Sequence, residues 1–112
     1  MAVVKQQAPF GSQTRSRVLV LLRLLGSTYA RELARLLEQP LSVVQKALRT
    51  LERDGLIAAQ TQGRTRVFRL NPAYFATAEL AAYLARLAQA DRNLSARAAS
   101  LRKRPRRTGK PL

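Results

Sequence analysis

Three consecutive segments of the chain place apolar residues at intervals of three and four, the spacing that puts them on one face of a helix. Gly26 ends the first segment, Pro40 opens the third and Gly55 ends it, and each of these residues disfavours continuation of a helix. The breaks between the segments are only a few residues long. The pattern therefore predicts three short helices that follow one another closely.

The polar residues within these segments indicate which side of each helix is buried. The first helix is expected to begin after Ser12, its N-cap, and the third to end near Asp54. The second helix begins near Tyr29, and the charged residues expected opposite its apolar side are Arg31, Glu32, Arg35 and Glu38. The residues of the third helix expected to face inward are Val44, Ala47, Leu48 and Leu51.

Two short runs with strand character follow, residues 56–61 and 65–70, and the second alternates between two faces. Gly63 lies between them, which predicts a β-hairpin. Asn71 and Pro72 then predict the cap and first turn of a last helix. This helix continues to about Leu101 without glycine or proline, and would span ~45 Å at 1.5 Å per residue.

The segment from Tyr29 to Leu37, followed by the segment from Leu41 to Ile57 with its Glu-Arg-Asp-Gly-Leu ending, resembles a known DNA-binding motif. It is similar to the winged helix-turn-helix of ArsR- and MarR-type bacterial transcriptional regulators, and residues 63–72 are similar to the wing of that motif. The resemblance covers residues 14–75. It implies a mainly α fold of the α+β winged-helix class, with a three-helix helix-turn-helix core, a two-stranded β-hairpin wing and a long C-terminal helix.

The same interpretation divides the chain into four parts. Residues 1–11 are expected to form a flexible N-terminal arm and residues 12–75 the winged helix-turn-helix DNA-binding domain. Residues 76–101 are expected to form a C-terminal dimerisation helix, and residues 102–112 a disordered basic tail.

Charge indicates the class of partner. The chain carries 21 Lys and Arg against 6 Asp and Glu, so its formal net charge is +15. The tail contributes six of these cations and no acid, which leaves +9 on residues 1–101. Nucleic acid and an anionic membrane surface both satisfy such a charge. The longest apolar stretch, Val18 to Leu25, is interrupted by Arg23 and is too short to cross a membrane.

The third predicted helix carries a polar face that suits base recognition. No acid occurs from Leu41 to Leu51, and the face combines side chains that match base-edge donors, acceptors and thymine methyl groups. These candidate DNA-binding residues are Ser42, Val43, Gln45, Lys46 and Arg49. The alternative is an ordinary solvated helix face, which normally mixes both signs of charge.

Two further groups of residues are expected to contact phosphates. Arg64, Thr65 and Arg66 lie beside the wing glycine, where long cationic side chains can reach phosphates or a narrow minor groove. The alternative is that these residues serve only solubility. The tail cations expected to make non-specific phosphate contacts are Arg102, Lys103, Arg104, Arg106, Arg107 and Lys110.

Leucines recur at seven-residue intervals in the last predicted helix, which is typical of a helix that pairs with another chain. The predicted dimerisation residues are Leu80, Leu84, Leu87, Leu94 and Leu101. Asp91 interrupts the pattern and disfavours an extended coiled coil. The alternative is an amphipathic helix folded back on its own core.

The chain has no Cys and no His, which excludes disulfides, thiol switches and histidine-based nucleophilic catalysis. We expect no enzyme activity, no cofactor and no metal. The leading interpretation is a cytoplasmic, nucleoid-associated bacterial transcriptional regulator that binds specific sequences in double-stranded DNA as a homodimer. The alternatives are an architectural or RNA-binding protein without base specificity, and a winged-helix protein-interaction adaptor.

Overall fold

The computed structural model of the protein describes residues 9–103. Its elements in chain order are α1 (Gln13–Leu25), β1 (Ser27–Tyr29), α2 (Ala30–Leu37), α3 (Leu41–Arg53), β2 (Ile57–Gln62), β3 (Thr65–Leu70), α4 (Thr77–Ala90) and α5 (Arg92–Lys103). This order confirms the predicted α+β class and the helix-turn-helix followed by a hairpin. It adds one strand and divides the predicted last helix.

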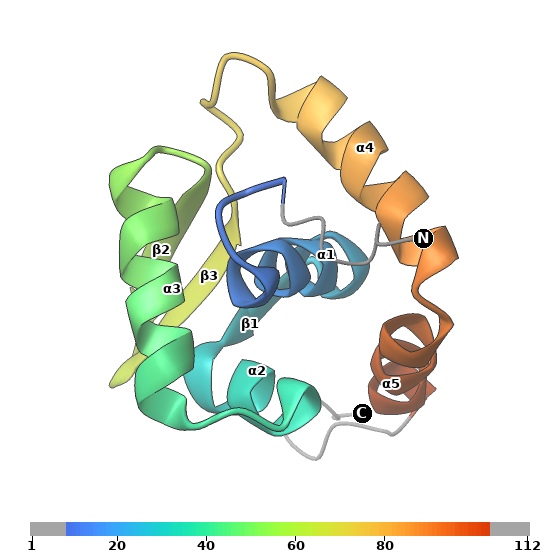
Figure 1. Cartoon of the computed structure of the whole chain (residues 1–112). Coiled ribbons are helices and arrows are strands. Elements are labelled where there is room, and N and C mark those ends of the chain that lie inside the picture. The colour runs from blue at the N-terminus through green and yellow to red at the C-terminus, as the bar shows by residue number, and fades with distance from the viewer. Residues whose placement is uncertain (1–8, 104–112) are drawn as a thin grey trace, which may run out of the picture.

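Helix α1 is the centre of the fold (Figure 1). Five consecutive residues, Val18 to Leu22, are buried, so the helix is apolar on all sides over this stretch. A helix of this kind needs neighbours on every side. It contacts α3 on one flank and α4 and α5 on another, and β1 and β3 also pack against it.

The predicted helix boundaries at α1 and α3 are confirmed with one small change. The Arg15 N–H donates to Ser12 Oγ at 3.1 Å, which caps α1, and Gly26 ends that helix with a φ of 87°. Gly55 follows α3 with a φ of 85°, a conformation that disfavours side chains. Pro40 precedes the first helical residue of α3 rather than occupying it.

The three strands form one antiparallel sheet in the order β1-β3-β2. Strands β2 and β3 make the predicted hairpin, with Gln62 opposite Thr65. Strand β1 pairs with the other edge of β3 and places Thr28 opposite Phe68. A three-residue strand between two helices is too short for an alternating pattern, and its partner lies far along the chain, which is why the sequence did not predict it.

The predicted outward position of Glu32 is wrong. Glu32 is only 7% exposed, and it accepts a hydrogen bond of 2.5 Å from the Thr28 hydroxyl. Arg35 lies 3.7 Å from its other oxygen. Because Glu32 lies in the first turn of α2, where the helix dipole favours negative charge, this buried carboxylate has both a donor and a favourable field.

The continuous C-terminal helix predicted up to Leu101 is also wrong, because the chain bends at Asp91, which has φ −108° and ψ 83°. Asp91 Oδ1 accepts the Leu94 N–H at 3.0 Å and so acts as the N-cap of α5. The Ser95 hydroxyl donates to the Ala88 carbonyl at 2.7 Å across the bend. The bend directs α5 back onto α1 and α2, where Leu94 is fully buried.

The predicted cap at Asn71 and Pro72 does not start a helix, since α4 begins at Thr77. Asn71 instead fixes the end of the hairpin. Its amide donates to the Gly55 carbonyl at 2.9 Å, and its oxygen accepts the Ala73 N–H at 2.9 Å. The residues before α4 form turns.

We expect Asp91→Ala to lower the free energy of unfolding by about 1 kcal/mol, because the first turn of α5 loses its cap. Asp91→Asn keeps a capping oxygen and should cost less. Urea unfolding of both variants checks this. An Asp91→Ala variant as stable as the wild type would contradict the capping role.

Candidate nucleic-acid interface

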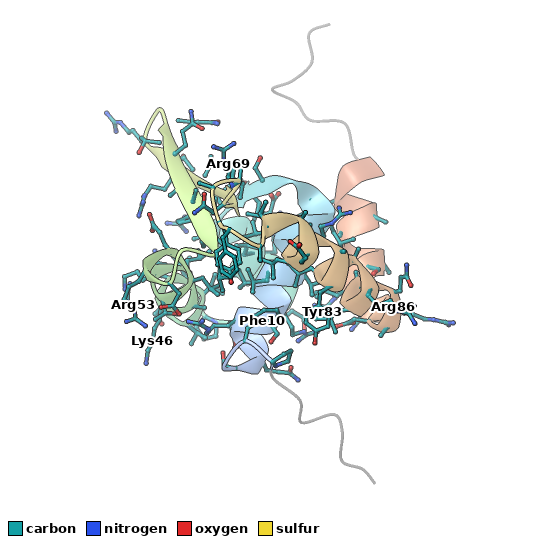
Figure 2. All side chains as sticks on the ribbon, turned by 90° about the horizontal axis from the view of Figure 1, so that it is seen from above. Phe10, Lys46, Arg53, Arg69, Tyr83 and Arg86 are labelled. Carbon is teal, nitrogen blue, oxygen red and sulfur yellow. The ribbon has the colours of Figure 1, made fainter. Side chains whose placement is uncertain are left out.

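Helix α3 presents its two faces as the sequence predicts. Val44, Ala47, Leu48 and Leu51 are buried against the core. The side chains on the opposite side are all exposed, and these are Ser42, Val43, Gln45, Lys46 and Arg49. In Figure 2, Lys46 projects from α3 away from the rest of the molecule.

An open groove of about 540 Å³ lies between α3 and the hairpin. It brings together five of the predicted DNA-contacting residues, namely Gln45, Arg49, Arg64, Thr65 and Arg66. Val43 and Lys46 instead line a smaller depression of about 390 Å³ beside α1, and Ser42 lines neither. Exposed α3 side chains and the hairpin arginines thus border one groove, whose charged lining residues are four arginines and Glu52.

Arg66 already has partners within the protein. Its guanidinium lies 2.9 Å from a carboxylate oxygen of Glu52, in the last turns of α3. It also lies 5.4 Å from the centroid of the Phe68 ring, a distance typical of a cation–π contact. Arg66 therefore connects the hairpin to α3.

No family model and no curated protein matches the chain. Solved structures do match it. The adhesin competence repressor AdcR from Streptococcus pyogenes aligns with a TM-score of 0.61 and 19% identity, over 93% of this chain and 74% of that protein. HlyU from Vibrio cholerae aligns with a TM-score of 0.52 and 27% identity, over 66% of this chain and 74% of HlyU.

The MarR family transcriptional regulator SPO1453 from Silicibacter pomeroyi aligns with a TM-score of 0.52 and 24% identity, over 71% of this chain and 57% of that protein. The chain has a winged helix-turn-helix fold. In this fold α2 and α3 form the helix-turn-helix, α3 occupies the position of the recognition helix, and the β2–β3 hairpin is the wing.

The structure adds two residues of the helix-turn-helix that the sequence did not single out. Tyr29, the last residue of β1, and Arg31, in the first turn of α2, line the groove, and Tyr29 lies beside the wing strand β3, opposite Val67. Tyr29 begins the apolar pattern of the second predicted helix, but the structure places it in the edge strand β1, where it is 38% exposed. Its position depends on a strand that no local pattern revealed.

Arg15 of α1 fixes the C-terminal half of the recognition helix. It donates to the Thr50 hydroxyl at 2.5 Å and to Asp54 Oδ2 at 3.0 Å. The same guanidinium donates to the Phe10 carbonyl at 2.5 Å. One partly buried side chain thereby links the segment before α1 to the last turns of α3.

Other arginines also serve the winged-helix core rather than its surface. Arg17 lies 3.9 Å from Asp91, and Arg23 donates to the Ala81 carbonyl at 3.1 Å. Arg97 donates to the Leu36 carbonyl and lies 3.5 Å from Glu38. Within residues 9–103, by contrast, Lys46, Arg49 and Arg64 form no ion pair and remain available to a polyanion.

The leucines predicted to mediate dimerisation have contacts within the chain. Leu80, Leu84 and Leu94 are buried, and Leu87 and Leu101 are partly buried against the same core. The bend at Asp91 makes this possible, because it folds the second half of the pattern onto α1 and α2. A partner chain would therefore meet the outer surfaces of α4 and α5 rather than a free row of leucines.

The tail residues lie mostly beyond the described part of the chain. Arg102 and Lys103 belong to the last turn of α5, whereas Arg104, Arg106, Arg107 and Lys110 lie outside residues 9–103. Across the described residues, no group of three or more acidic side chains is placed to hold a metal ion. None of the helices there is long and apolar enough to cross a membrane.

The ion pair at the end of the recognition helix predicts a pH dependence. The Arg15 hydrogen bond, together with Arg53, holds the pKa of Asp54 below its ordinary value of 3.8, against an opposing effect of burial. A carboxyl with a lower pKa when folded stabilises the protein fully above its unfolded pKa. This contribution disappears as the pH falls through the folded pKa.

We therefore expect the difference in unfolding free energy between the wild type and Asp54→Asn to stay constant from neutral pH to about pH 5, and to shrink below about pH 4. Urea unfolding at a series of pH values measures this difference. Glu79→Gln, which removes an exposed acid from α4, is the control. A difference between wild type and Asp54→Asn that does not shrink as the pH is lowered below about 4 would contradict the role of Arg15.

Proposed function

We propose that the protein is a transcriptional regulator that binds specific sequences in double-stranded DNA as a homodimer, in the cytoplasm of a bacterium. The observation that carries the proposal is the exposed face of α3 beside the wing. It combines an amide, a hydroxyl, a methyl-bearing side chain and two cations, and it contains no acid before Glu52. The fold shared with AdcR and SPO1453, whose names describe a repressor and a transcriptional regulator, supports it.

The exposed side chains of α3 and of the wing suit this role. A major groove admits one α-helix, and α3 has solvent along its whole outer face. Gln45 and Arg49 would then reach base edges, and the exposed Val43 would meet a thymine methyl group. Arg64 and Thr65 at the wing turn would contact the flanking phosphates.

The first test separates base reading from phosphate binding. We expect Gln45→Ala or Arg49→Ala to cost about 1–3 kcal/mol on the preferred duplex and little on random DNA, whereas Arg64→Ala should weaken both alike. Competition binding at a fixed salt concentration measures each loss. Arg86→Ala, on α4 and pointing away from α3 in Figure 2, is the matched control and should change neither.

The outcomes also separate the alternatives. Equal losses on both DNAs for Gln45→Ala would favour an architectural or RNA-binding protein without base specificity. Unchanged DNA affinity in both α3 variants would favour a protein-interaction adaptor whose tail alone contacts nucleic acid. A specific regulator should prefer one duplex over random DNA by ~10³-fold or more.

The dimer part of the proposal rests on aromatic side chains that the chain leaves exposed. Phe75, just before α4, is 91% exposed, and Tyr83 on α4 is 45% exposed. Tyr83 lies beside Phe10 (Figure 2). Large exposed apolar groups mark surfaces that pack against a partner. A two-fold dimer through this side would favour an inverted repeat with half-sites ~34–36 Å apart.

We expect sedimentation equilibrium to show a dimer at tens of micromolar, and Phe75→Ser combined with Tyr83→Ser to shift it to monomer. Both side chains are exposed, so the thermal unfolding transition of the monomer should remain cooperative. Leu94→Asp is not a useful test, because Leu94 is buried in the chain's own core and the variant would unfold. A wild type that stays monomeric with and without DNA would rule the dimer out.

A further inference from the structure

One acidic side chain, Glu52, lines the groove between α3 and the wing beside four arginines. It does not stand alone there, because its carboxylate lies 2.9 Å from the Arg66 guanidinium. Arg66 is one of the three wing residues that the sequence predicts to contact DNA. The ion pair therefore holds Arg66, which is predicted to contact phosphates, against the last turn of α3.

We propose that Glu52 is a positioning residue that holds Arg66 out of reach of DNA phosphates and thereby limits sequence-independent binding. The inference rests on the proposed function and names a residue that controls its selectivity. Glu52 would act on Arg66 alone. Arg64, two residues earlier at the wing turn, remains free to contact the backbone.

The geometry holds Arg66 from two sides. The Glu52 carboxylate accepts a hydrogen bond from Nη2 at 2.9 Å, and the guanidinium stacks over Phe68 at 5.4 Å from the ring centroid. Phe68 is itself buried in the core. Arg66 lies opposite Thr61, one residue pair from the end of the hairpin, so the contact also ties the wing near its tip to α3.

The exposure of the pair argues against a role in stability. The side chains of Arg66 and Glu52 are 55% and 35% exposed, and ion pairs at such surfaces contribute little to folding. The pair matters more for the charge of the groove than for the stability of the fold. The pair cancels one of the cations that the groove presents to a duplex, and sequence-independent affinity depends on the number of phosphate contacts.

Salt dependence of binding to a random duplex tests the inference on the full chain. Glu52→Gln keeps the shape of the side chain and releases Arg66, so it should steepen the slope of log affinity against log salt by ~0.9. Affinity for random DNA should rise by roughly 5- to 10-fold at about 0.1 M salt, with a smaller gain on a preferred duplex. Glu79→Gln removes the same charge from α4 and should leave the slope unchanged.

The double variant Glu52→Gln with Arg66→Gln identifies the cause. Its slope should return to the wild-type value, because the released cation is gone. A slope that stays steep in the double variant would overturn the inference, since Glu52 would then act by repelling DNA directly. An unchanged slope in Glu52→Gln, or no binding of any of these proteins to random DNA, would overturn it as well.

Failure of the proposed function has a different signature. A wild type with no preference for any duplex would remove base-specific regulation. The slope change between wild type and Glu52→Gln on random DNA would still decide whether Glu52 holds Arg66. Thermal unfolding of Glu52→Gln, Glu79→Gln and the double variant checks that each comparison is made between folded proteins.

Discussion

Burial of α1 on all sides is the constraint on which the rest of the structure depends. Each leucine in the Val18 to Leu22 run contributes roughly 1.5–3 kcal/mol when fully removed from water, and no single neighbour could cover a helix that is apolar all round. The helix-turn-helix covers one flank and α4 with α5 covers another. Arg15, Arg17 and Arg23 anchor the polar positions of α1 to α3, α5 and α4.

This arrangement decides which charges remain available for function. Helix α3 must turn its apolar residues toward α1, so its hydroxyl, amide and cationic residues face solvent beside the wing. Several arginines that raise the net charge are used to hold helices together, and Arg66 is paired with Glu52. The basic character of the chain thus has two sources, one structural and one directed toward a polyanion.

Local patterns sufficed for much of this fold. The caps at Ser12 and Gly26, the break at Pro40 and the hairpin around Gly63 depend on neighbouring residues only, and the sequence predicted them. The helical spacing of the apolar residues of α3 also predicted which of its side chains are exposed. Strand β1, the burial of Glu32 and the bend at Asp91 depend on contacts between distant segments. The leucines recur at the predicted spacing, but the bend at Asp91 packs them into the chain's own core.

We propose that the outer face of α3 reads base edges in the major groove. Selection of bound duplexes from a randomised pool, followed by mapping of guanine N7 methylation that interferes with binding, measures this contact, because N7 lies in the major groove. We expect an enriched motif in which methylation at N7 blocks binding. A pool that stays random after repeated selection, or an enriched motif indifferent to N7 methylation of its guanines, would contradict it.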